Sequence, residues 1–268
     1  MMPCAELRCC TRLLIALALA AGCLPSQSAG EDRDDEKPKP PRTKTPAIVL
    51  TSVVDLRAAA NRDGFVLRYG VKHADVEKLR AAVSNIARVV LLHETRRKAR
   101  YVGRSCNVRV IGTTANAPAV IALSFKRGGF FGKRQVQTRN NVAVIGAAVA
   151  RSLFQGIDPV GRNVRIGPNY FLVTGVLKPT GARKNEADFD SAVFIPLTTM
   201  QSRVNLDNLD VSRKAGTFTA RQVELTQVLI AVPVKTAIRE TAESIREYFE
   251  KFHKAKDVEV GLTVSGKR

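Results

Sequence analysis

Two strand–helix–strand patterns, one near each end of the chain, restrict its fold more than any other sequence feature. Apolar, β-branched runs predict the strands, and apolar residues spaced three and four apart predict the helices. The six segments are Ile48–Val54, Asp75–Val83 and Ile86–Leu92 in the first pattern, and Val223–Val232, Thr236–Phe252 and Val258–Val264 in the second. Helices of this kind bury one face against a sheet, so the patterns predict an α+β chain in which both units build one split sandwich lobe.

The segment between the two patterns predicts an inserted, β-rich lobe with one helix. Asn141–Ile145 is expected to be a short buried strand, and Ala147–Phe154 two turns of helix. Pro159 cannot continue that helix, and Gly161 tolerates the positive φ of a turn. Three further strands are expected, the first two joined by a hairpin turn at Gly167–Asn169: Asn163–Ile166, Tyr170–Leu177 and Asp190–Leu197.

The inserted segment also carries five short motifs in unbroken order. They are Val142–Gly146, Val149–Phe154, Asp158–Gly161, Val164–Ile166 and Phe171–Leu177. Together they resemble the signature of the MacB-like periplasmic core domain, the extracytoplasmic domain of MacB/FtsX-type ABC transporter permeases. Three flanking stretches add to the likeness, the second without the arginine of the family's Gly-Arg-Phe-Phe stretch: Tyr101–Thr114, Gly129–Phe131 and Phe194–Thr199. The resemblance covers Pro46–Leu262, nearly all of the chain that follows the leader.

The resemblance implies a fold and a set of structural residues. The fold would be a porter-like split β-α-β α/β-sandwich lobe over 46–115 and 205–268, carrying an inserted β-rich lobe over 116–204. The motif positions carried over as structural are Gly146, Leu153, Phe154, Asp158, Pro159, Gly161, Gly175 and Pro196.

The resemblance also implies a role outside the cytoplasm. In the family this domain lies between two transmembrane helices of an ATPase-driven permease, where it engages an adaptor or cargo and does no chemistry. Here no apolar run of membrane-spanning length follows Val264. A phosphate-binding loop is not expected either, because Gly132-Lys133-Arg134 lacks the first glycine and the following hydroxyl of that motif. We therefore expect that the chain does not couple ATP hydrolysis to transport by itself.

The N-terminus predicts export. Arg8 and Arg12 precede the apolar run Leu13–Ala21, which is far shorter than the roughly 20 residues of a membrane-spanning helix. Residues 1–22 are therefore predicted to be a signal peptide. The stretch Ala20–Cys23 resembles a lipobox, although Ala20 stands where leucine is usual, and we expect lipid attachment at Cys23.

One alternative for the leader stays open, and a linker is predicted after it. An ordinary cleavage after Ser28 stays open and would leave a soluble periplasmic or secreted protein. Residues 23–45, rich in charge and proline, are predicted to be an extended tether. With a lipid anchor, that tether would hold a periplasmic domain at a membrane.

Charge and composition restrict the kinds of partner that the chain is expected to bind. The chain has 43 Lys and Arg against 24 Asp and Glu, a net charge of +19 that attracts anionic lipids or polymers. The basic residues are spread along the chain and there is no Trp, which argues against a nucleic-acid partner.

Cys4, Cys9 and Cys10 lie in the predicted leader and Cys23 would carry lipid. Cys106 then stands alone, so no internal disulfide is expected.

Polar clusters typical of enzymes are not expected. His93-Glu94 begins like a zinc-protease helix, but Arg97 occupies the position of the second histidine. Cys106 near Arg104 is either a reactive thiol or, as we favour, a packed strand residue. Asp158 before Pro159 is expected to be a turn residue rather than a catalytic acid. We predict no enzymatic activity, no cofactor and no metal.

Two functions remain. The leading hypothesis is a non-catalytic, membrane-tethered interaction component of an ABC export system, which contacts a permease or periplasmic adaptor. The alternative is a basic envelope-surface protein that binds anionic lipids or polymers.

Overall fold

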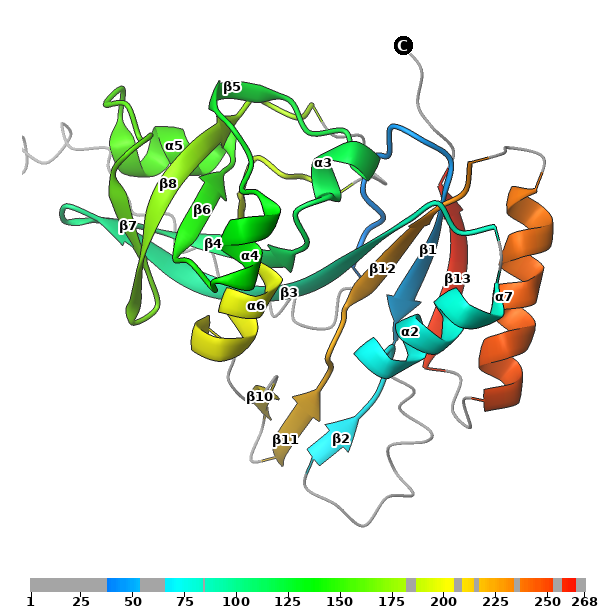
Figure 1. The fold of residues 1–268 in the computed structure, drawn as a ribbon. Helices are drawn as coiled ribbons and strands as arrows, with labels where there is room; N and C mark the ends of the chain where they lie inside the picture. The colour runs from blue at the N-terminus through cyan, green and yellow to red at the C-terminus, as the bar shows by residue number, and fades with distance from the viewer. Residues whose placement is uncertain are drawn as a thin grey trace, which may run out of the picture. The chain divides into compact units, whose positions relative to one another are not determined.

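The computed structural model describes residues 38–53, 66–83, 85–181, 187–204, 209–214, 217–233, 237–252 and 257–263 (Figure 1). The expected signal peptide, Cys23 and most of the expected tether lie outside these residues. In chain order the elements are β1 (Ala47–Ser52), β2 (Val66–Arg68), α2 (His73–Ala82), β3 (Arg88–Tyr101), β4 (Arg104–Thr113), α3 (Ala117–Val120), β5 (Phe125–Gly128), α4 (Lys133–Gln137), β6 (Val142–Ile145), α5 (Ala147–Phe154), β7 (Asn163–Ile166), β8 (Asn169–Leu177), β9 (Ala192–Pro196), α6 (Leu197–Thr199), the π-helical turn η1 (Met200–Val204), β10 (Leu209–Lys214), β11 (Thr217–Gln222), β12 (Gln227–Ala231), α7 (Ile238–Phe252) and β13 (Val258–Thr263).

One ten-stranded sheet holds most of these strands. Its order is β13-β1-β12-β3-β4-β9-β6-β8-β5, and β7 pairs with both β3 and β8. The two strand–helix–strand units interleave, because β12 lies between β1 and β3, and β1 lies between β12 and β13. The connecting helices α2 and α7 lie on the same side of these strands (Figure 1). The result is a mixed α/β fold.

The alternation of side chains along the strands divides the core between the two faces of the sheet. On β3, Val89 packs with α2 and α7, whereas Val90 packs under α3 and beside Phe131. Further along the face of Val89, Ala99 packs with α5 and its residues Leu153 and Phe154. One face is therefore covered by α2, α7 and α5, and the other by α3 and the segment that includes Phe131.

Several sequence predictions coincide with these elements. The helix Ala147–Phe154 and the strand Asn163–Ile166 are confirmed at both ends. The predicted turn after Ile166 is a two-residue hairpin: Ile166 pairs with Asn169, and Gly167 has φ +57°. The first helix begins two residues earlier than predicted, at His73, and the last begins two residues later, at Ile238.

Residues 38–45, which we expected to belong to the tether, are hydrogen-bonded to the domain instead. Gln227 Nε2 donates to Pro38 O at 3.0 Å, and Ala187 N donates to Pro40 O at 3.1 Å. Thr43 is buried and bridges Ile121. An extended, proline-rich backbone keeps its carbonyl oxygens free to accept such bonds, so the packed part begins before residue 46.

A second, three-stranded sheet, β10-β11-β2, was not predicted.

Within the described ranges, no helix is both long enough and apolar enough to cross a membrane.

Candidate interaction surfaces

The motif residue Gly146 fixes the start of α5 against the strand β9. A Cβ atom at this position would lie 2.1 Å from Phe189 O and 2.4 Å from Asp190 O. Asp190 O in turn accepts from Ala148 N at 2.9 Å, and Gly146 N donates to Ala192 O at 2.8 Å. Only a residue without a side chain permits this close backbone approach, which satisfies amide groups at the helix N-terminus.

The motif residues Leu153 and Phe154 are fully buried at the end of the same helix. The Phe154 ring lies 4.2 Å from the Tyr101 ring, centroid to centroid. Leu153 O accepts from Arg104 Nη1 at 3.3 Å. These two residues therefore bind α5 to the end of the β3–β4 hairpin.

The motif residues Asp158, Pro159 and Gly161 form the loop after α5. Asp158 Oδ1 accepts from Val160 N at 3.2 Å, and this bond, together with an ion pair to Arg127, lowers the pKa of the Asp158 carboxyl. Pro159 is buried. Gly161 has φ +80° and donates to Val173 O at 2.9 Å, which closes the loop onto β8. Asp158 is thus a turn residue, as expected.

The remaining motif positions lie in the sheet. Gly175 of β8 faces Gly129, whose carbonyl oxygen would be 2.5 Å from a Cβ at 175. Pro196 ends β9 opposite Thr113 of β4. The eight structural positions therefore gather around α5 and its neighbouring strands, and none of them forms a cluster of reactive side chains. Cys23 lies outside the described residues.

His93 is buried and belongs to the packing between β3 and the segment before β12. Its Nδ1 lies 3.1 Å from Glu224 O, the geometry of a donor to that carbonyl. Its pKa is lowered to about 4, mainly by burial and to a smaller extent by the nearby Arg97 and His73, so His93 is neutral at pH 7. Within the described ranges, no group of three or more His, Cys, Asp or Glu side chains is placed to hold a metal ion.

Cys106 is a half-buried residue of β4. Burial raises the pKa of its thiol, and a hydrogen bond with Ser152 opposes that effect only in part. A raised pKa leaves little thiolate at neutral pH, so the packed strand residue that we favoured is the better description.

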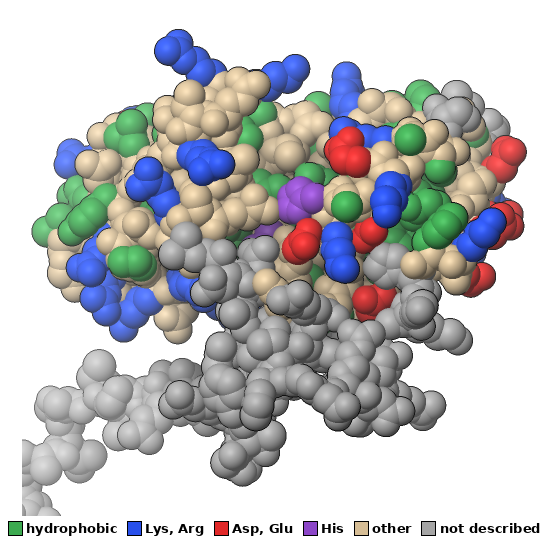
Figure 2. Space-filling view, turned by 60° about the horizontal axis from the view of Figure 1, so that its bottom comes forward, with side chains coloured by type: hydrophobic (Ala, Val, Ile, Leu, Met, Phe, Trp, Pro, Cys, Tyr) green, Lys and Arg blue, Asp and Glu red, His purple; other side chains and the backbone are tan. Residues whose placement is uncertain are grey.

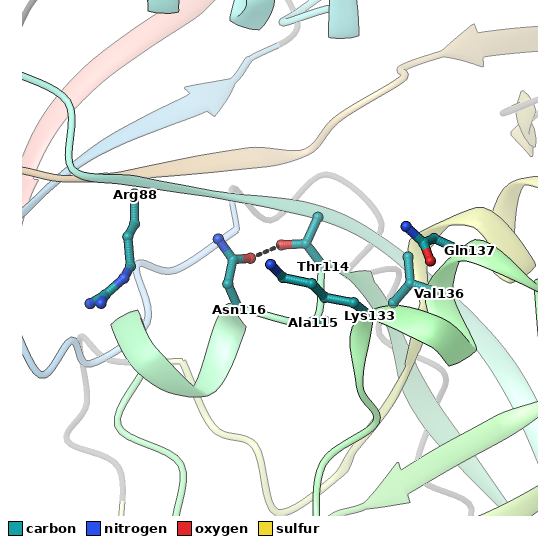
Figure 3. A pocket seen from close by; sticks show the side chains of 7 residues that line it. All are labelled: Arg88, Thr114, Ala115, Asn116, Lys133, Val136 and Gln137. Carbon is teal, nitrogen blue, oxygen red and sulfur yellow. Dashed lines mark hydrogen bonds between the residues drawn. The ribbon is translucent and has the colours of Figure 1, made fainter.

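An open pocket of about 490 Å³ lies between the end of β4 and α4 (Figure 3). Thr114 Oγ1 donates to Asn116 Oδ1 at 2.5 Å, and Asn116 Nδ2 donates to Val89 O at 2.9 Å, which holds the amide in place. In Figure 3 the Lys133 side chain extends toward these two residues, and Arg88 lies on the far side. The pocket offers cationic, hydroxyl and amide groups.

A second surface lies on the part of the sheet that α3 and the segment with Phe131 do not cover. On β3, Val90 and Leu92 are buried beneath the α3 side of the core, whereas Lys98 and Arg100, on the same face, are exposed. We call this region the open sheet face and define it by six residues from four strands: Lys98, Arg100, Asn107, Arg165, Tyr170 and Leu172. The change from apolar to basic at alternate positions of β3 marks the point at which the sheet meets solvent.

The sequence analysis did not group these six residues. The sequence shows only that basic residues are spread along the chain. The alternation of basic residues over 96–100 was the available signal, but the pairing of β3 with β7, which brings Arg165 beside Arg100, is a long-range contact.

Charge is unevenly distributed over the surface. Figure 2 shows Lys and Arg without Asp or Glu over the half that carries β7 and β8, and Asp and Glu mixed with Lys and Arg over the half that carries α2 and α7. In the sequence, residues 94–204 contain 18 of the 43 basic residues and only 5 of the 24 acidic ones. Because acidic residues are scarce there, residues 94–204 form the electropositive part of the chain.

The structure is a mixed α/β domain with an open pocket and an uncovered end of its sheet. The family model of the MacB-like periplasmic core domain matches residues 42–248. The chain belongs to this family, whose members are periplasmic domains of transporter permeases.

Curated relatives carry the same domain within much longer chains. The macrolide export ATP-binding/permease protein MacB of Nitrobacter winogradskyi is 29% identical over 152 residues, which cover 56% of this chain and 21% of the relative. MacB of Azoarcus sp. is 37% identical over 109 residues, covering 39% and 17%. The pyoverdine export ATP-binding/permease protein PvdT of Pseudomonas aeruginosa is 26% identical over 135 residues, covering 50% and 20%. The matched part thus spans about a fifth of each relative.

Solved structures share the fold. The periplasmic region of MacB from Actinobacillus actinomycetemcomitans has a TM-score of 0.58 at 16% identity, covering 86% of this chain and 92% of that one. The extracellular domain of the transporter YknZ from Gram-positive bacteria also has a TM-score of 0.58, at 19% identity, covering 80% and 99%.

Proposed function

We propose that this chain is a non-catalytic, extracytoplasmic component of an ABC export system that works by binding protein partners. The match to the family model over residues 42–248 is the observation that carries this proposal. The protein partners that we propose are a permease or a periplasmic adaptor of the export system. The described residues offer surfaces for such contacts, whereas the buried, neutral His93 and the half-buried Cys106 offer no activated group for chemistry.

The proposal includes a division of the chain into lobes. We infer a porter-like lobe over 46–115 and 205–268 and an inserted lobe over 116–204. The interleaving of β1, β12, β3 and β13 supports the first lobe, and the pairing of β6 with β8 and β9 supports the second, with α5 packed where that lobe meets β3 and β4. The motif residues then act structurally, because Gly146 holds α5 close to Phe189 and Asp190, and Leu153 and Phe154 hold it against the β3–β4 hairpin.

Export and anchoring are also part of the proposal. The leader over 1–22 would be removed, Cys23 would be acylated, and the following residues would tether the domain to the membrane. The charged composition of residues 31–37, which lacks any apolar run, supports a tether.

Copurification of partners from membranes tests the main proposal. Wild-type protein and the Cys23→Ala variant would be crosslinked in intact cells and recovered with their neighbours, which are identified by mass spectrometry. We expect wild type to retain a permease or adaptor in the membrane fraction, and Cys23→Ala to lose its membrane location. Recovery of no transporter component with wild type would overturn the export-system role. An unchanged location of Cys23→Ala would overturn the anchor alone.

A second function, binding to anionic envelope surfaces, is favoured by the positive net charge of the chain and by the scarcity of acidic residues over 94–204. Exposed cations attract anionic surfaces through a long-range interaction that salt screens. We expect the protein to bind anionic vesicles, with an affinity that falls steeply as salt rises. Cosedimentation across a salt series tests this, and salt-independent binding would contradict it.

A further inference from the structure

We propose that the open sheet face binds the phosphate headgroups of an anionic phospholipid bilayer. This inference rests on the second proposed function and deepens it, because it names the residues and the chemistry of the contact.

Strand register places the cations of this face in one row. Arg100 of β3 pairs with Arg165 of β7, and Arg165 pairs with Tyr170 of β8. Directly opposite residues of antiparallel strands point to the same face of a sheet. Neighbouring strands are about 4.8 Å apart, so this row spans roughly 10 Å from β3 to β8, about the width of a lipid headgroup. Lys98, two residues before Arg100, extends the row along β3.

These cations lack an acidic partner. In the described part of the chain, no carboxylate forms an ion pair with Lys98, Arg100 or Arg165. Arg165 Nε donates to Gly167 O at 3.1 Å, which leaves the charge of the guanidinium uncompensated. Like charges directly opposite on a sheet destabilise it, and a bound phosphate would neutralise them.

Apolar side chains lie among the cations, and they favour a bilayer over a soluble polyanion. Tyr170 and Leu172 of β8 are 60% and 41% exposed, and Val102 at the tip of the β3–β4 hairpin is 81% exposed. Arg165 lies over the Tyr170 ring at 6.0 Å. Basic residues that reach phosphates beside a tyrosine and aliphatic side chains are typical of a membrane interface. A soluble polyanion would gain little from Val102 and Leu172.

A second copy of the chain fits this face less well. The net charge of +19 makes two copies repel each other, and the face itself adds three cations of the same sign. Charge complementarity therefore selects an anionic partner.

Vesicle cosedimentation of charge-matched variants tests the inference. All proteins carry Cys23→Ala, so that no acyl chain contributes. The face variant is Lys98→Gln/Arg100→Gln/Arg165→Gln, and the control variant, on the exposed surface of α7, is Arg239→Gln/Arg246→Gln/Lys251→Gln. Both lose the same charge, and far-UV circular dichroism with urea unfolding checks that both fold.

We expect the face variant to lose affinity for phosphatidylglycerol-containing vesicles on the order of a hundredfold, since each basic residue near such a surface contributes about 1 kcal/mol. The control should keep most of its affinity. Equal losses in both variants would overturn the site but leave the anionic-surface function standing. No binding by the parent protein would overturn that function itself.

A second pair of measurements separates lipid from soluble polyanion. Tyr170→Ser/Leu172→Ser should weaken binding to phosphatidylglycerol vesicles and leave binding to inorganic polyphosphate unchanged. Equal affinity of this variant and its parent for the vesicles would overturn the bilayer assignment in favour of a soluble polyanion.

Discussion

Arg100 of β3 lies directly opposite Arg165 of β7, two cations in antiparallel register at the uncovered end of the sheet. Each position on these strands would more commonly carry a β-branched residue or an opposite charge. The pair therefore costs stability in the absence of an anion, and this cost can be measured.

We expect Arg100→Thr to raise the free energy of unfolding by about 0.2–1 kcal/mol at low salt, because it removes the repulsion and introduces a β-branched side chain. Urea unfolding at low and high salt checks this. The gain should shrink as salt rises, since salt screens exposed charges. A loss of stability, or a gain that salt does not change, would contradict an unfavourable charge pair.

Gly146→Ala should destabilise the domain by about 2–4 kcal/mol, because the new Cβ would overlap Phe189 O and Asp190 O, which are backbone atoms that cannot swing away. Thermal and urea unfolding measure the change. Gly132→Ala is the matched control: it also precedes a helix, and its Cβ would meet only Gln135 Oε1 at 3.9 Å. Similar losses for both variants would mean that a general glycine effect, and not the close approach to β9, determines the result.

Leu153→Ala should cost about 2–5 kcal/mol, because the side chain is fully buried between α5 and the sheet and its removal leaves a cavity. The exposed Leu172→Ala serves as the control and should change the free energy of unfolding by less than about 0.5 kcal/mol. If Leu153→Ala were as mild as the control, α5 would not be part of the core.

Acid should destabilise the domain through His93. Burial lowers its pKa from 6.5 to about 4 in the folded state, so the unfolded chain takes up a proton at a higher pH than the folded chain does. The contribution of neutral His93 to the free energy of unfolding is present above pH 6.5 and is lost as the pH falls toward 4. That loss is on the order of 3 kcal/mol.

Urea unfolding of wild type and His93→Gln across this pH range isolates the effect. Glutamine can still donate to Glu224 O but does not titrate, so the variant should lose less stability between pH 6.5 and 4 than wild type. Parallel pH profiles would show that His93 is accessible to protons in the folded state.

The elements that the sequence predicted well are those with a strong local signal. The helix Ala147–Phe154 lies between a glycine and a break at Gln155–Gly156, where φ is positive at both residues. The hairpin after Ile166 has a glycine and a proline at its two turn positions. Local backbone chemistry is enough to predict such features.

The elements that were missed depend on contacts between distant residues. β3 was expected to end at Leu92 because its apolar run ends there, yet it continues to Tyr101. The extension is held by pairing with β4 and β7, which the composition of a basic segment does not indicate. The open sheet face could not be predicted for the same reason, since it exists only once β3, β7 and β8 are aligned.

The interleaved strand order has a mechanical consequence. β1 and β13 are antiparallel neighbours, and Ala47 at the start of one pairs with Thr263 at the end of the other. A pulling force applied at these two residues would act along the direction of the inter-strand hydrogen bonds, which run perpendicular to the strands. The bonds would then bear the load one after another, as in a zipper, instead of sharing it. The pair of strands should therefore resist a force along β1 and β13, which loads all of these bonds together, better than a force that pulls Ala47 and Thr263 apart.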